Sequence, residues 1–141
     1  MTDSYRTLAR PFEHEPEKVK GSRHVANLFP VASAEEIEAA LATVRARMPD
    51  ANHHAFAWRL GRNDHEFRYS DDGEPSNSAG PPILGVIRAN DLTHVLFAVV
   101  RYFGGTKLGV GGLIEAYREG AAEALANGVV VERIRTQRLR I

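Results

Sequence analysis

The apolar run Val95–Val100 constrains the fold more than any other segment, because its six consecutive apolar residues leave no polar face. Such a strand is typical of the centre of a sheet, covered on both sides or by one large layer. Five of the next twelve residues, 101–112, are glycine, and a helix-like segment continues from Leu113 to Asn127. The sequence therefore predicts a central strand, a glycine-rich loop and a helix in direct succession.

The glycine-rich loop has the composition of an anion site. Glycine lets the backbone adopt positive φ and approach a ligand closely. The first N–H groups of a helix lack intrahelical partners and carry partial positive charge. We therefore predict an anion site made of the loop's glycines and two cationic residues: Arg101, Gly104, Gly105, Lys107, Gly109, Gly111 and Gly112.

No established nucleotide fingerprint fits this loop. In a P-loop the lysine follows a glycine, whereas Lys107 follows Thr106. The glycine frame beginning at Gly109 ends on Ile114, where a dinucleotide fingerprint has its last glycine. A tight strand-to-helix turn that binds no ligand is the alternative interpretation.

An acidic turn precedes the loop, with Asp71, Asp72 and Glu74 within four residues. Carboxylates could hold Mg²⁺, or they could pair with the cations of the loop. We favour pairing, and we predict that Asp72 or Glu74 approaches Arg101 or Lys107.

The sequence gives little sign of metal or nucleophilic chemistry. The adjacent His53 and His54 would face opposite sides of a strand, and no H-E-x-x-H or G-x-S-x-G motif occurs. The absence of cysteine excludes thiolate catalysis and disulfides. We predict no catalytic residue, no metal site and no cofactor.

Charge and hydropathy restrict the partners. The 141 residues carry 18 Lys plus Arg and 18 Asp plus Glu, so the formal net charge is +0 and gives no bulk attraction to nucleic acid or membranes. The N-terminal segment lacks the apolar core of a signal peptide, and no apolar run approaches the ~18 residues that span a membrane. We predict a cytoplasmic protein with no membrane partner.

Local signals predict the remaining elements. A strand is expected over 22–31, and the capping box from Ser33 to Glu36 begins a helix that ends near Met48. A hairpin is expected over 54–69, a short helix capped by Ser78 after it, and a last strand over 129–134. Residues 1–17 are expected to be a loose lead-in with at most one short strand.

These elements predict an α+β fold, a two-layer sandwich with a mixed β-sheet and helices on one face. In the last helix, small residues recur every four positions and should let its backbone lie close to the sheet. They are Gly112, Ala116, Gly120 and Ala124. A glycine cap at Gly128 is expected to end this helix.

Two long motifs carry a family resemblance. Residues 101–113, Arg-Tyr-Phe-Gly-Gly-x-x-Leu-Gly-x-Gly-Gly-Leu, followed by Ala116-Tyr117, resemble the signature of the Impact/YigZ family, as do 69–75 with 79–82. Shorter matches at 20–23 and 50–58 extend the resemblance over roughly 18–131. It implies a two-layer fold like that of elongation-factor domain IV. It also implies a cytosolic domain linked to control of translation, which in eukaryotic members inhibits the initiation-factor kinase that senses amino-acid starvation.

The resemblance and the residues together predict a regulatory or binding protein rather than an enzyme. Its domain should occupy 18–135, and its tail, 136–141, should stand where bacterial relatives begin a second, ferredoxin-like domain. The expected partner is a protein or RNA of the translation machinery, or a phosphate-like anion; the oligomeric state stays open.

Two alternatives remain from other classes. One is an RNA-binding module with a cationic patch formed by Lys20, Arg23, Arg101, Lys107 and Arg118. The aromatic residues among these cations, which could stack on bases, are Tyr102, Phe103 and Tyr117. The other is a phosphate- or nucleotide-binding enzyme, for which the acidic turn would have to supply the base.

Overall fold

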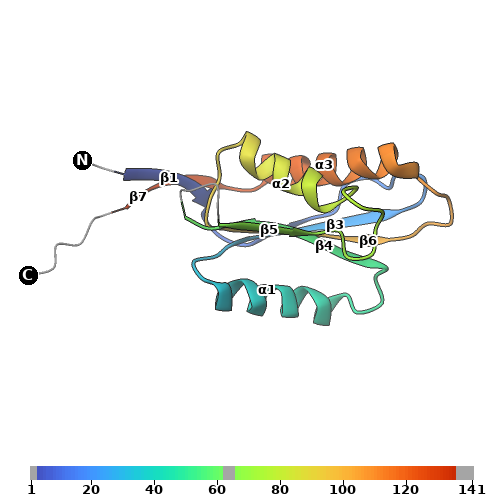
Figure 1. The fold of residues 1–141 in the computed structure, drawn as a ribbon, viewed down its shortest axis with the longest axis horizontal. Helices are drawn as coiled ribbons and strands as arrows, with labels where there is room; N and C mark the ends of the chain where they lie inside the picture. The colour runs from blue at the N-terminus through green and yellow to red at the C-terminus, as the bar shows by residue number, and fades with distance from the viewer. Residues whose placement is uncertain (1–2, 62–65, 136–141) are drawn as a thin grey trace, which may run out of the picture.

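A computed structural model of the protein describes residues 3–61 and 66–135. In these residues a five-stranded antiparallel sheet lies between helices (Figure 1). In spatial order its strands are β2 (Phe12–His14), β3 (Arg23–Pro30), β6 (Val95–Tyr102), β4 (His53–Arg59) and β5 (Phe67–Ser70). The helices are α1 (Ala34–Arg47), α2 (Gly80–Ala89) and α3 (Gly109–Asn127).

The apolar run forms the middle of β6, the central strand, as predicted. Val95, Phe97 and Val99 pack into the core under α2 and α3. Leu96, Ala98 and Val100 pack into a second core against α1. The strand has no polar face because both of its faces are buried by helices.

The α+β class is confirmed, but two details of the predicted sandwich were wrong. Helices cover both faces of the sheet, with α1 on one side and α2 and α3 on the other (Figure 1). The five-stranded sheet is antiparallel throughout rather than mixed. A helix packs on the second face of the sheet because α1 has its own apolar stripe, which must be buried against a separate apolar surface. The stripe consists of Ile37, Leu41 and Val44.

The predicted capping box begins α1. The hydroxyl of Ser33 accepts a hydrogen bond from the backbone N–H of Glu36 at 3.2 Å. The Glu36 carboxylate reaches back and accepts from the N–H of Ala32 at 3.0 Å, one residue before the expected partner. Two otherwise unpaired N–H groups are thus satisfied at the helix start.

The predicted lead-in forms two strands where at most one short strand was expected, so that prediction was wrong for residues 3–14. Strand β1 (Asp3–Leu8) pairs with β7 (Val130–Arg135) in a separate two-stranded sheet, and β2 forms an edge of the main sheet. Leu8 is fully buried in the core under α2 and α3. The predicted tail, 136–141, lies outside the described residues.

Helix α3 differs from its prediction at both ends. It begins at Gly109, so three of the predicted loop glycines lie in its first turn. At its other end Gly128 has a φ of −87°, which is not the left-handed cap expected, because the chain extends directly into β7. No helix in the described part of the chain is long and apolar enough to cross a membrane.

The small-residue stripe of α3 also divides between two surroundings. Ala124 is fully buried in the core, as expected. A methyl group on Gly120 would instead meet the ring of Pro16 at 3.9 Å, so Gly120 faces the segment after β2 and the predicted sheet contact was wrong.

The N-cap residue of α2 is Ala79 rather than the predicted Ser78, whose hydroxyl donates to the Pro75 carbonyl. The Asp71 carboxylate accepts hydrogen bonds from the backbone N–H groups of Asn77, Ala79 and Gly80, at 2.8, 3.0 and 2.8 Å. One side chain from the acidic turn therefore satisfies the start of the helix.

Replacing Asp71 with alanine should lower the free energy of unfolding by about 1–3 kcal/mol, because three N–H groups, two of them partly buried, lose their acceptor. The exposed Asp50 provides the control, and Asp50→Ala should stay within about 0.5 kcal/mol. Urea denaturation measures both, and equal midpoints for the two variants would contradict the capping role.

Candidate functional site

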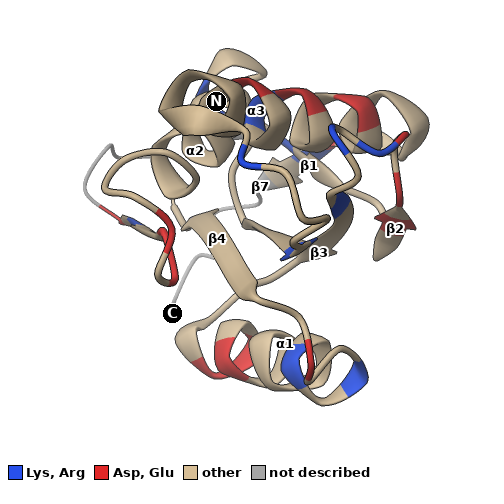
Figure 2. Cartoon of the chain, turned by 90° about the vertical axis from the view of Figure 1, so that its right-hand side faces the viewer, with Lys and Arg blue, Asp and Glu red and all other residues tan. Residues whose placement is uncertain are grey.

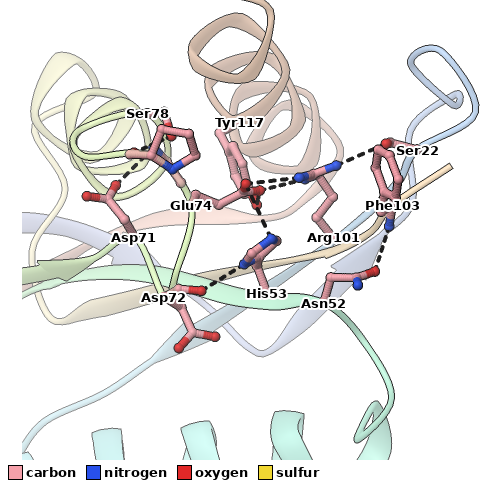
Figure 3. Close-up of polar contacts among 12 residues, drawn as sticks. Ser22, Asn52, His53, Asp71, Asp72, Glu74, Ser78, Arg101, Phe103 and Tyr117 are labelled. Carbon is pink, nitrogen blue, oxygen red and sulfur yellow. Dashed lines mark hydrogen bonds and ion pairs between the residues drawn. The ribbon is translucent and has the colours of Figure 1, made fainter. Parts of the chain in front are cut away.

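A buried ion pair joins the glycine-rich loop to the acidic turn (Figure 3). The Arg101 guanidinium, at the end of β6, donates from Nε to Glu74 Oε2 at 2.5 Å and from Nη2 to Oε1 at 2.9 Å. The side chains of Arg101 and Glu74 are only 8% and 2% exposed. The predicted approach of the two motifs is therefore confirmed, in a bidentate and buried form.

Three further residues complete the network around this pair. The Tyr117 hydroxyl, on α3, donates to Glu74 Oε2 at 2.5 Å. Arg101 Nη1 donates to the hydroxyl of Ser22 at 3.1 Å, and the ring of His53 lies 3.4 Å from Glu74 Oε1. Residues just before β3, on β4, after β5, on β6 and on α3 thus meet at one point.

The network neutralises Arg101, one of the two cations that were expected to bind an anion. Burial by itself raises the pKa of Glu74, but hydrogen bonds from Arg101 and Tyr117 and the charge of Arg101 outweigh it and lower that pKa. Burial raises the pKa of Tyr117, so its hydroxyl stays protonated as a donor. Arg101 therefore presents little net charge to a ligand.

Only Glu74 of the acidic turn reaches the predicted cations. Asp72, with a left-handed φ of 44°, accepts a hydrogen bond from the backbone N–H of His54 at 2.6 Å and so fixes the turn to β4. Asp71 caps α2. Each of the three carboxylates thus accepts hydrogen bonds that hold parts of the fold together.

Gly104 has a structural role in the loop. A Cβ atom built on it would lie 2.0 Å from the carbonyl carbon of Gly21, and its N–H donates to the Ser22 hydroxyl at 3.2 Å. By contrast, a Cβ on Gly105 or Gly111 would meet nothing within 4 Å. The glycines therefore divide into one that packs two backbones together and others that leave an open surface.

A pocket of about 360 Å³ opens beside the ion pair. Its rim includes two exposed apolar side chains, Phe103 (47% exposed) and Val110 (52% exposed), and the exposed Lys107. Lys107 makes no ion pair within residues 3–61 and 66–135. The pocket is lined by Glu74, Pro75, Arg101, Phe103, Lys107, Leu108, Gly109, Val110 and Leu113.

The start of α3 borders the same pocket. Gly109 and Val110 line it, and no side chain caps the helix, whose N-cap residue is Leu108. The first-turn amides and the Lys107 ammonium thus supply positive charge at the rim. The predicted site is reduced to these groups, because Arg101 is paired.

The cationic patch of the RNA alternative does not assemble as predicted. Arg101 is buried, and Arg23 is paired with the carboxylate of Glu15 at 2.8 and 3.0 Å and lies over the ring of Tyr102. Tyr117, one of the aromatic residues considered for base stacking, is fully buried. Figure 2 shows basic and acidic segments interspersed along the chain.

The sequence predicted no role in the site for Ser22 or Val110, and it indicated Phe103 and Tyr117 only as residues that could stack on bases. Ser22 and Tyr117 lie within the segments that carry the family resemblance, which was the available signal. Their bonding partners come from distant parts of the chain, so spacing could not reveal them. Among the described residues, no three His, Asp or Glu side chains are grouped to hold a metal ion.

Comparison with known proteins places this arrangement in a family. The model of the Impact N-terminal domain matches residues 20–125. The chain belongs to the Impact family. The resemblance carried by the glycine-rich loop and the acidic turn is thereby confirmed.

Two curated members and one solved structure show how far the likeness extends. The "IMPACT family member YvyE" of Bacillus subtilis is 39% identical over 133 residues, covering 94% of this chain and 61% of that protein. A Thermus thermophilus member is 50% identical over 107 residues, covering 76% of this chain and 56% of that protein. The crystal structure of a hypothetical protein, 36% identical, has a TM-score of 0.87 and covers 94% of this chain and 65% of its own. The chain thus spans about three fifths of the length of these Impact proteins.

The ion pair predicts a sharp contrast between two cations of the loop. Arg101→Ala should cost about 3–5 kcal/mol of stability, because it leaves the Glu74 carboxylate buried without its partner. The exposed Lys107→Ala should stay within about 0.5 kcal/mol. Thermal and urea unfolding test this, and the double variant Arg101→Ala/Glu74→Ala should recover part of the loss. An Arg101→Ala protein as stable as Lys107→Ala would show that the pair contributes nothing.

A second contrast concerns the glycines. Gly104→Ala should destabilise the fold by about 1–3 kcal/mol, because its methyl group overlaps the backbone of Gly21. Gly111→Ala adds the same methyl group in open space within a helix and should be neutral or slightly stabilising. If both variants melt together, the close backbone approach is not required.

Proposed function

We propose that this Impact family member is a regulatory binding protein of the translation machinery that docks a protein partner through the tip formed by residues 103–110. The observation that carries the proposal is the exposed pair Phe103 and Val110, which flank Lys107 at the rim of the pocket. A buried ion pair holds the base of this tip in place.

The chemistry of the tip favours a protein over a free anion. An aromatic side chain beside an apolar pocket is the usual form of an energetic anchor in protein–protein interfaces. The Lys107 ammonium and the uncapped start of α3 add a complementary site for a carboxylate or phosphate group on the partner. A helix terminus contributes about 0.3–2 kcal/mol and a charged hydrogen bond about 1.5–3, which together bind free phosphate only at about millimolar concentration.

The connection to translation rests on the family. The resemblance described above implies a domain that acts in translational control, and the chain belongs to that family. Cytoplasmic location and binding of an anionic group at the glycine-rich loop are part of the same proposal. The carboxylates of the acidic turn are engaged in structural bonds, which favours binding over catalysis.

The test uses capture of ribosomes and translation factors from cell extract by the immobilised protein. Phe103→Ala and Lys107→Ala should each reduce retention about tenfold, since each removes a rim contact worth roughly 1.4 kcal/mol. Ile134→Ala is the matched control, because it removes an exposed apolar side chain on β7, at the other end of the molecule (Figure 1). Equal retention by all three variants would contradict the tip as the docking site.

Two further measurements separate the partner classes. If ribonuclease treatment releases the captured translation factors from the immobilised protein, the partner is RNA rather than protein. A phosphate titration followed by NMR should move the amides of residues 105–112 at about millimolar concentration. Shifts confined to other regions would remove the anion component of the proposal.

A further inference from the structure

A second pocket, larger than the one at the tip, lies between α3 and the segment that connects β2 to β3. Its volume is about 590 Å³. We call it the His24 pocket. It is lined by His14, Glu15, Pro16, Glu17, Lys18, Val19, His24, Ala116, Glu119, Gly120, Glu123 and Asn127.

The imidazole of His24 is the feature that distinguishes this pocket. The side chain comes from β3, where His24 is only 1% exposed. Its ring lies nearly perpendicular to the ring of Tyr117, and the two ring centroids are 5.3 Å apart. Neither ring nitrogen has a hydrogen-bond partner among the described residues. Buried polar groups are nearly always paired, because leaving one unpaired costs about 1–3 kcal/mol. Because His24 also lines the pocket, its unpartnered imidazole points to a bound molecule.

The protonation state of His24 defines what it can bind. Burial, with the nearby Arg101 guanidinium, lowers its pKa to about 4. The ring is neutral at pH 7 and offers one N–H donor and one nitrogen acceptor. The acceptor nitrogen suits a ligand that carries N–H groups.

The small residues of α3 make room for such a ligand. Glycine inside a helix costs about 1 kcal/mol relative to alanine. The surrounding structure does not require it at Gly120, since an added Cβ would meet only Pro16, at an ordinary 3.9 Å. Gly120 and Ala116 both line the pocket, so the missing side chains leave space above His24.

The lining is acidic. It contains four glutamates against one lysine, and Figure 2 shows acidic segments along α3. Glu15 is paired with Arg23, and Oε2 of Glu123 lies 2.7 Å from Nε2 of His14. Glu17 and Glu119 make no ion pair in the described part of the chain, so the pocket has an excess of negative charge for a cation.

From these observations we infer that the His24 pocket binds a small organic cation with a primary ammonium group. The ammonium donates to the acceptor nitrogen of His24, while Glu17 and Glu119 balance its charge. An organic cation fits better than a metal ion, because no three acidic or histidine side chains of the described residues converge as metal ligands. The site goes beyond the proposed function, since its lining residues are separate from the tip at 103–110.

Histidine-labelled protein titrated with putrescine at pH 7 and low salt tests the inference. The ring ¹⁵N signals of His24 should shift saturably, with a dissociation constant of about 1 mM or lower. 1,4-Butanediol, which has the same length without charge, should bind at least about tenfold more weakly. Saturable binding of the diol at equal strength, or no shift of His24 with putrescine, would overturn the inference.

Three variants assign the binding to the pocket. His24→Phe keeps the aromatic ring and removes both nitrogens, and Glu17→Gln/Glu119→Gln keeps shape and removes charge; each should weaken putrescine about tenfold or more. Glu38→Gln, an exposed change on α1 across the sheet, is the matched control and should bind as wild type. If His24→Phe does not fold, the double glutamine variant decides alone. Wild-type affinity in the double variant would overturn the inference, because putrescine would then bind elsewhere.

Discussion

The buried pair of Arg101 and Glu74 is the interaction on which the site depends. Taking both charges out of water costs several kcal/mol per ion, and only well-aligned hydrogen bonds offset that cost. Here the bidentate contact is completed by donation from Tyr117 to Glu74 and by donation from Arg101 to Ser22. Because each partner belongs to a different element, the pair fixes how the tip, the acidic turn and α3 meet. It determines geometry rather than offering charge to a ligand.

The parts of the fold that sequence predicted are those specified locally. The cap at Ser33 depends on atoms within four residues, and β6 is identified by its own composition. The composition of β6 did not predict how many helix layers pack on the sheet, because a strand with no polar residue does not reveal whether one or both faces of the sheet are covered. The pairing of β1 with β7 joins opposite ends of the chain. No periodicity in so short a strand predicts a partner more than a hundred residues away, so β1 was interpreted as lead-in.

The candidate site likewise combines contacts that the sequence predicts with contacts that it does not predict. Opposite charges in two dense motifs were enough to predict that Glu74 and Arg101 meet. Burial was not predictable, because it depends on Tyr117 and Ser22 closing over the pair from distant segments. The glycine content predicted a loop whose backbone lies close to another group. For Gly104 that group is the backbone of Gly21 and not a ligand. A glycine-rich motif therefore indicates that the backbone is closely packed, but it does not identify the group against which it packs.

This division also runs through the family motif, because most of the motif residues described above specify the scaffold while Phe103 is exposed at the tip. Of the motif residues, Arg101 and Tyr117 are buried and Gly104 is packed against another backbone, so they specify the scaffold. Lys107 and Val110 occupy positions that the motif leaves open, and both are exposed at the rim of the tip pocket. Two chains can therefore share the motif and its geometry while presenting different surfaces to their partners. Tyr117 links the scaffold to both pockets, since its hydroxyl binds Glu74 beside one and its ring packs on His24 beside the other. Each pocket is thus lined by a residue that contacts the same buried side chain.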